Sequence, residues 1–73
     1  MSRFEIIYND DTKVIIIKDH CEESYILKQW VDDYNNGKNP KEIIIHANDR
    51  SYYFSCRDVK HAEFIKSELK PLV

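Results

Sequence analysis

Histidine and cysteine are the residues in this sequence with the most versatile chemistry, because both can bind metals and both can act in catalysis. His20 and Cys21 are adjacent, and four residues separate Cys56 from His61. Structural zinc sites usually use pairs such as C-x2–4-C or H-x3–5-H, which neither pair matches. Both cysteines lie near predicted helix starts, where a thiol can become mildly reactive. We nevertheless assign these residues structural roles and predict no metal, no cofactor and no catalytic residue.

Enzyme classes that need a phosphate loop or a deep pocket fit this chain poorly. A single glycine rules out a glycine-rich phosphate loop, and no nucleophile-elbow pattern is present. Acid–base catalysis needs a concave and partly dry pocket, for which 73 residues provide little depth. We therefore predict that the protein is not an enzyme.

The composition indicates one domain covering residues 1–73. Apolar residues make up 42% of the chain, and charged residues make up 33% with a net charge of −2. This balance favours neither disorder nor a partner chosen by charge alone. The apolar runs are far shorter than the ~20 residues of a membrane span. Two cysteines and no signal peptide predict reduced thiols and a cytoplasmic location.

Turn residues divide the chain into elements. Residues 3–8 and 13–18 are rich in β-branched and aromatic side chains and flank the turn types of residues 9–12, which predicts a β-hairpin. Residues 42–46 and 50–54 predict a second one. Asp19 and Glu22 resemble a capping box that opens a helix, and Gly37 suits the position after its end. Ser55 and Asp58 predict a cap for a second helix, which ends at Lys70 before a proline.

The two halves of the chain share one pattern at an offset of 38 residues, so residues 4–36 and 42–72 form a weak internal repeat. In the first helix one face carries the apolar residues Ile26, Leu27, Trp30, Val31 and Tyr34. The offset selects the face Phe64, Ile65, Glu68, Leu69 and Leu72 for the second helix. The predicted fold is α+β: two ββα units form a four-stranded, mainly antiparallel sheet with two helices packed on one face.

The alternation of side chains predicts apolar residues on both faces of this sheet. If each hairpin has a two-residue turn, the residue numbers of two facing residues add up to 21 in the first hairpin and to 97 in the second. Two helices cover one face, so the other face needs a second copy or another protein as its cover. Tyr25 adds an exposed anchor on the polar face of the first helix. The predicted interface residues are Phe4, Ile6, Tyr8, Ile15, Ile17, Ile44, Tyr53 and Tyr25.

These observations favour a non-catalytic protein-interaction module that forms a homodimer through the open sheet face or an edge strand. Ile, Lys, Asn, Tyr and Phe are abundant whereas Gly, Ala, Arg and Pro are scarce, which suggests an AT-rich genome. An accessory protein of a phage or mobile element that binds and modulates a host protein fits this composition. The alternative is a small nucleic-acid-binding domain that uses Arg50, Tyr53, Arg57 and Lys60. The slight net negative charge weighs against it.

Overall fold

The computed structural model describes residues 2–47 and 50–65, and within them the chain forms one helix and five strands. The elements in chain order are β1 Ser2–Tyr8, β2 Lys13–Lys18, α1 Glu22–Asn35, β3 Ile43–Ala47, β4 Arg50–Phe54 and β5 Val59–Ile65. Strands β2, β1 and β5 form an antiparallel three-stranded sheet in that order, and β3 pairs with β4 in a separate two-stranded sheet. The prediction of two helices on a four-stranded sheet is therefore wrong.

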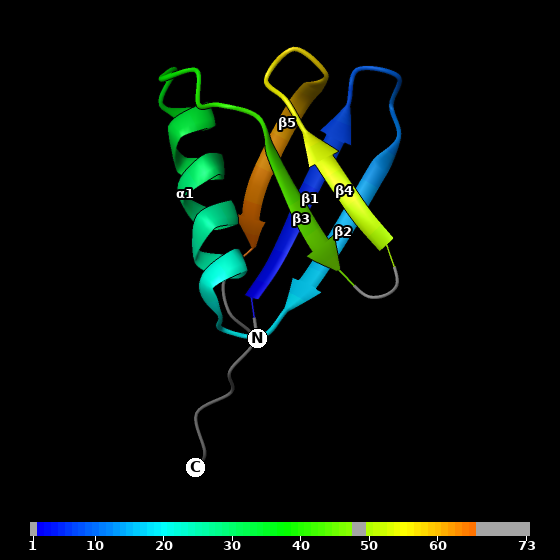
Figure 1. Cartoon of the computed structure of the whole chain (residues 1–73). Coiled ribbons are helices and arrows are strands. Elements are labelled where there is room, and N and C mark those ends of the chain that lie inside the picture. Colours follow the sequence, from blue (N-terminus) through cyan, green and yellow to red (C-terminus); the bar gives the residue numbers. More distant parts are fainter. Residues whose placement is uncertain (1, 48–49, 66–73) are drawn as a thin grey trace.

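The elements are arranged in two layers (Figure 1). The three-stranded sheet forms one layer, and α1 together with the β3–β4 hairpin forms the other. The hairpin crosses in front of β1 and β2, while α1 lies beside β3 and β5. A helix and a hairpin thus cover the same sheet face, where the sequence had predicted two helices.

The first hairpin differs from the prediction by one position. Phe4 faces Ile16 and Ile6 faces Val14, so facing positions sum to 20 and not to 21. The loop has three residues because Asp11 adopts a left-handed φ of 73°, a conformation that Asp tolerates better than most residues. Since side chains alternate along a strand, this one-residue change exchanges the two faces of β2 relative to β1.

The second hairpin has the predicted register. Ile44 faces Tyr53 and Ile45 faces Tyr52, so facing positions sum to 97 as expected. Ile45 is buried, whereas Ile44 and Tyr53 are exposed. The predicted division of this hairpin into a core face and an outer face is confirmed by the pairing, although its turn residues 48–49 lie outside the described residues.

Helix α1 begins later than the Asp19–Glu22 box predicted. Its N-cap is Cys21, whose backbone N–H donates to Ser24 Oγ at 2.9 Å, so Ser24 supplies the reciprocal cap. The helix ends as predicted before Gly37, which has a left-handed φ of 73°. The buried face includes three of the five predicted residues, Leu27, Trp30 and Val31, while Ile26 is exposed and Tyr34 is half-buried.

The segment predicted to begin the second helix forms β5 instead. Ala62 and Phe64 alternate with outward-facing residues, and they pair with Ile6 and Phe4 of β1. Without β5, one edge of β1 would be unpaired in the centre of the fold. Because buried backbone N–H and C=O groups need hydrogen-bond partners, this segment is stabilised as a strand beside β1. The 38-residue offset is therefore no guide to structure here, because it aligns a strand with a helix. The remainder of the predicted helix, residues 66–70, lies outside the described residues.

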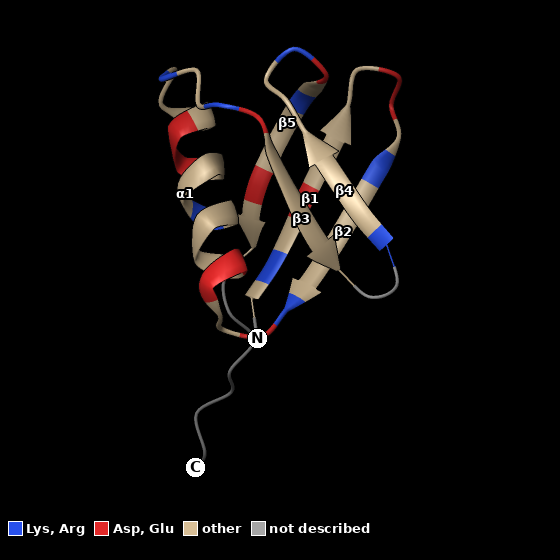
Figure 2. Ribbon diagram, in the orientation of Figure 1, with Lys and Arg blue, Asp and Glu red and all other residues tan. Residues whose placement is uncertain are grey.

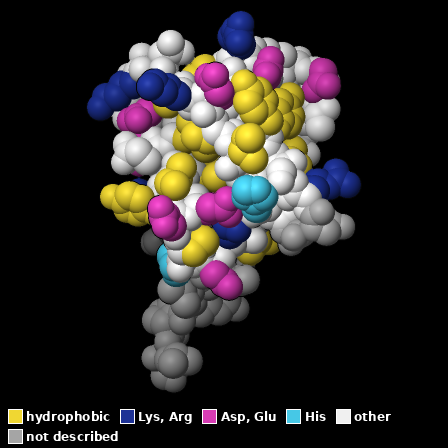
Figure 3. Space-filling model, viewed as in Figure 1, with side chains coloured by type: hydrophobic (Ala, Val, Ile, Leu, Met, Phe, Trp, Pro, Cys, Tyr) yellow, Lys and Arg dark blue, Asp and Glu magenta, His cyan; other side chains and the backbone are white. Residues whose placement is uncertain are grey.

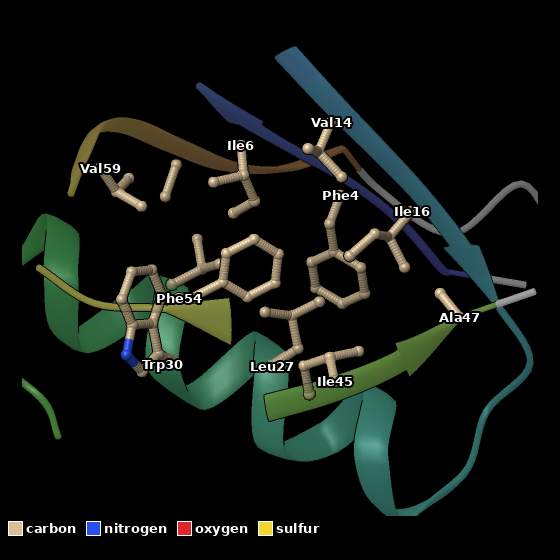
Figure 4. Packing of buried hydrophobic residues seen from close by; sticks show 12 residues of the cluster. Phe4, Ile6, Val14, Ile16, Leu27, Trp30, Ile45, Ala47, Phe54 and Val59 are labelled. Atoms are coloured by element: carbon tan, nitrogen blue, oxygen red, sulfur yellow. The ribbon is translucent and has the colours of Figure 1, made fainter. Parts of the chain in front are cut away.

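The core lies between the two layers (Figure 4). Phe4 and Ile6 from β1 point toward Leu27 and Phe54 in the opposite layer. The buried apolar residues of the core are Phe4, Ile6, Val14, Ile16, Leu27, Trp30, Val31, Ile45, Ala47, Phe54, Val59 and Ala62. Every strand and the helix contribute to this cluster, so the two sheets share a single core.

Candidate functional site

The structure separates the eight predicted interface residues into three groups. Phe4 and Ile6 are fully buried in the core. In the observed register they face Ile16 and Val14, so all four side chains lie on the covered face of the sheet. Tyr8 is half-buried, and its hydroxyl donates to the Tyr53 carbonyl at 2.9 Å, which ties β1 to β4. These three side chains stabilise the layers and do not form an open apolar patch.

Ile15 and Ile17 lie on the outer face of the three-stranded sheet. The register places them in rows with residues of β1 and β5: Ile17, Arg3 and Ile65 in one row, and Ile15, Glu5 and Glu63 in the next. Ile17 is 47% exposed. The predicted apolar patch on this face is thus interrupted by charges, although isoleucines remain concentrated along β2.

The backbone edge of β2 is the second feature of this site. The Tyr8 N–H donates to the Thr12 carbonyl, so these two residues form a hydrogen-bonded pair. Hydrogen-bonded and non-hydrogen-bonded pairs alternate along antiparallel strands, so the backbone N–H and C=O groups of Lys13, Ile15 and Ile17 point away from β1. No other strand in residues 2–47 and 50–65 pairs with this edge. An unpaired strand edge is a template for adding another strand.

Side chains hydrogen-bond to some of the outward backbone groups on the other sheet edges. The Tyr34 hydroxyl donates to the Val59 carbonyl at 2.8 Å, and the Asn35 amide donates to the Ala62 carbonyl at 2.9 Å, so α1 caps β5. On β4, the Tyr53 carbonyl accepts the hydrogen bond from Tyr8. Such side-chain hydrogen bonds hinder pairing with another strand at these positions.

Glu23 and Lys18 close the edge of β3 at His46. The His46 N–H donates to the Glu23 carboxylate at 3.3 Å, and Lys18 Nζ donates to the His46 carbonyl at 2.6 Å. Glu23 also contacts the His46 ring at 2.7 Å and Lys18 Nζ at 3.1 Å. These interactions lower the pKa of the Glu23 carboxyl to about 2 from its ordinary 4.5. The hydrogen bond with the His46 side chain has the largest effect, and that with Lys18 has the next largest.

This pKa predicts a loss of stability in acid. Because the folded state lowers the pKa of Glu23, its contribution is complete above about pH 4.5 and is lost as the pH falls toward about 2. Glu23→Gln should therefore remove part of the acid sensitivity of the free energy of unfolding, measured by urea denaturation across this range. Glu22→Gln is the matched control, since Glu22 has no hydrogen bond or ion pair within the described chain. Equal acid sensitivity in the two variants would contradict the assignment.

The side of the molecule formed by α1, β3 and β4 carries several exposed apolar side chains. Of the five exposed large apolar residues in the part of the chain that the structure describes, four lie here: Tyr25 at 72%, Ile26 at 40%, Ile44 at 58% and Tyr53 at 47%. Figure 3 shows apolar side chains distributed across this face with acidic side chains among them. The predicted interface residues Tyr25, Ile44 and Tyr53 therefore lie on the side opposite Ile15 and Ile17.

A groove of about 300 Å³ runs on this side between α1 and the segment that leads into β3. Ile26, Trp30, Pro40 and Ile43 provide apolar lining, and the charged residues Asp33 and Lys41 also line the groove. The Trp30 indole N–H donates to the Lys41 carbonyl at 2.9 Å and so fixes the two walls together. Sequence reasoning assigned Ile26 to the core, and nothing in the helical periodicity distinguished it from its buried neighbours.

The residues of the nucleic-acid alternative are not gathered into one basic surface. Arg50 begins β4, whereas Arg57 lies beyond its other end and Lys60 forms an ion pair with Asp11. Tyr53 lines a pocket of about 360 Å³ that also includes Asp10 and Asp58. Carboxylates beside the aromatic ring oppose the binding of a phosphate backbone.

The cysteines and histidines remain separate. Cys21 is exposed, and hydrogen bonding from the Ser24 backbone at the helix start lowers its pKa, whereas burial raises the pKa of Cys56. Cys56 Sγ lies 3.5 Å from the Pro40 carbonyl, in a packing role. Residues 2–47 and 50–65 contain no group of three or more His, Cys, Asp or Glu that could hold a metal ion.

The helix of the described segments is too short and too polar to cross a membrane. Comparison with protein-family models, with curated proteins and with solved structures gives no significant match. The residues themselves therefore carry the functional argument.

Proposed function

We propose that this chain is a non-catalytic protein-interaction module that forms a homodimer by pairing β2 of one copy with β2 of another. One observation carries the proposal: within residues 2–47 and 50–65 no strand pairs with the outer edge of β2, while side chains hydrogen-bond to one or two backbone groups on each of β3, β4 and β5. Ile15 and Ile17, whose backbone groups form this edge, also place apolar side chains beside it.

The edge of β2 is complementary to itself. With a two-fold axis at Ile15, that residue lies opposite Ile15 of the second copy, and Lys13 lies opposite Ile17. All these residues direct their backbone groups outward, so the pairing forms about six hydrogen bonds between copies. The product is a continuous six-stranded sheet in which the isoleucines of both copies are neighbours. Lys13 keeps its contact with Glu5, at 3.6 Å within one copy.

The proposal includes a cytoplasmic location. Both cysteines are free, one exposed and one half-buried, as expected for a protein of a reducing compartment. The proposed role as an accessory protein of a phage or mobile element rests on the composition alone.

Ile17→Lys tests the homodimer. In the paired arrangement the new lysine lies opposite Lys13 of the second copy, where like charges repel, and it replaces an apolar contact. We expect the dimer dissociation constant to rise by about ten-fold or more, measured by sedimentation equilibrium at micromolar concentrations. The wild-type chain should sediment at about twice its mass of 8.8 kDa.

Ile44→Lys is the matched control, because Ile44 is also an exposed strand residue but lies on the other side of the molecule. This variant should remain dimeric with the wild-type dissociation constant. A wild-type chain that is monomeric throughout the micromolar range would refute the homodimer. A dimer that Ile44→Lys disrupts and Ile17→Lys leaves intact would move the interface to the opposite face.

A further inference from the structure

The turn between β1 and β2 and the loop between β4 and β5 border a pocket of about 360 Å³. Two tyrosines, two aspartates and one asparagine line this tyrosine–aspartate pocket: Tyr8, Tyr53, Asp10, Asp58 and Asn9. No lysine, arginine or histidine of the described chain is part of the lining. Pockets for small molecules begin at about 300 Å³, so this one suits a small ligand or a single side chain.

Hydrogen bonds between the two loops fix the walls of the tyrosine–aspartate pocket. The Asn9 backbone N–H donates to the Asp58 carbonyl at 2.8 Å, and the Asn9 side-chain amide donates to the Arg57 carbonyl. The Tyr8 hydroxyl donates to the Tyr53 carbonyl at 2.9 Å. Because the walls are already joined, binding of a ligand does not have to order these loops.

The pocket carries two negative charges that no cation in its lining balances. Asp10 Oδ1 accepts the Thr12 N–H at 2.9 Å, which lowers the pKa of this carboxyl and keeps it ionised at neutral pH. The Asp58 carboxylate has no hydrogen bond or ion pair within the described residues. Lys60 lies near, but its ammonium pairs with Asp11 outside the lining. Figure 2 shows acidic residues in both loops at this end of the molecule.

The tyrosines add a preference for an organic cation. Burial raises the pKa of the Tyr8 hydroxyl, and Tyr52, Asp58 and Asp10 raise it further in that order. Both carboxylates are therefore near enough to act on a hydroxyl in the pocket wall. Tyrosine rings attract cations that approach their faces, and they also contact apolar carbon. Aromatic rings beside carboxylates thus favour a cation that carries an apolar part.

We infer that the tyrosine–aspartate pocket binds a small organic cation such as an alkylammonium group. The charged nitrogen lies near the Asp10 and Asp58 carboxylates, and the carbon chain lies against Tyr53. A metal ion is a poorer occupant, because residues 2–47 and 50–65 contain no group of three or more acidic, histidine or cysteine ligands that could hold one. The cation comes from a free amine or from a lysine side chain of another protein.

n-Butylammonium tests the pocket, with n-butanol as its uncharged counterpart of similar size. Titrations at about 0.1 M ionic strength screen long-range attraction to the protein surface. Two exposed ion pairs and one cation–π contact should make n-butylammonium bind about ten-fold more tightly than n-butanol. Amide chemical shifts measured by NMR should change at residues 8–12, 53 and 57–59.

A capped glycine–lysine–glycine tripeptide distinguishes the two sources of the cation. If it binds about ten-fold more tightly than n-butylammonium, backbone contacts add to recognition and a protein lysine is the ligand. If the two bind equally, or the tripeptide binds more weakly, a free amine is the ligand.

Matched variants locate the charge and the ring. Asp58→Asn should weaken binding of n-butylammonium about three-fold to five-fold. Asp32→Asn removes the same charge from α1, outside the lining, and should change the affinity little. Tyr53→Leu should weaken binding about three-fold, whereas Tyr53→Phe keeps the ring and the affinity. Both Tyr53 variants should stay folded, because this side chain is exposed and Tyr8 contacts the Tyr53 backbone carbonyl.

Three results would overturn the proposal: equal affinity for n-butylammonium and n-butanol, equal effects of Asp58→Asn and Asp32→Asn, or shift changes confined to residues outside the pocket. Calcium chloride is titrated in parallel, and displacement of n-butylammonium by micromolar calcium would replace the organic cation with a metal ion. The titrations are repeated with the Ile17→Lys chain, since Ile17 does not line the pocket. Failure of the homodimer therefore does not affect the result.

Discussion

Phe4→Ala is expected to lower the free energy of unfolding by about 3–5 kcal/mol. Phe4 is fully buried, its ring centroid lies 5.1 Å from that of Phe64, and it points into the space between the layers. Removal of the ring leaves a cavity in the apolar cluster that both sheets share. A domain of this size has roughly 3–5 kcal/mol of stability in total, so the variant should be largely unfolded at room temperature.

Two further variants keep this prediction measurable by urea denaturation. Phe4→Leu retains most of the volume and should remain folded with a smaller loss of stability. Tyr25→Ala removes a ring of similar size from the surface and should change stability by less than about 0.5 kcal/mol. If Phe4→Ala and Tyr25→Ala had similar effects, Phe4 would lie on an open face, as the two-residue turn had predicted.

The second large effect is expected at Ala62. Ala62→Asp places a carboxylate at a position that is 2% exposed and faces Ile6 across the strand pair. A buried charge without a partner costs several kcal/mol, so we expect this variant to lose its cooperative unfolding transition. Circular dichroism during a urea titration measures the loss.

Neighbouring substitutions distinguish the strand from the predicted helix. Ala62→Ser should lower stability by about 1–3 kcal/mol while the chain stays folded. Glu63→Ala changes the next residue, which faces outward on β5, and should be nearly neutral. Equal tolerance at both positions would be inconsistent with an alternating strand.

The β2 edge and the groove beside α1 lie on opposite sides of the molecule. The β2 edge offers backbone hydrogen bonds beside Ile15 and Ile17, whereas the groove has a mainly apolar lining that also includes Asp33 and Lys41. A homodimer joined through β2 presents two copies of the groove.

Local features of the fold were predictable because short-range rules decide them. The end of α1 before Gly37 follows from the conformational freedom of glycine. The pairing of Ile44 with Tyr53 follows from a short turn between alternating residues. Tyr25 was correctly assigned to the exposed face of α1 from helical spacing alone.

The candidate sites were predicted only in part. Ile17, Ile44, Tyr53 and Tyr25 are exposed as expected, but the sequence placed Ile17, Ile44 and Tyr53 on one face, whereas Ile17 lies opposite the other two. The groove was not predicted at all, since it depends on how α1 lies against residues 40–43. No pattern along one element reveals a surface shared by two.

By itself, the sequence determined the first hairpin, the helix with most of its buried face, and the second hairpin with its register. The tertiary structure decided the rest. Asp11 in a left-handed conformation shifted the first register by one residue and moved Phe4 and Ile6 into the core. The segment beginning at Val59 became a strand because β1, more than fifty residues earlier, had an edge to pair. Apolar residues near the end of the chain fit either a helix or a strand, and such an ambiguity is resolved by a partner distant in sequence.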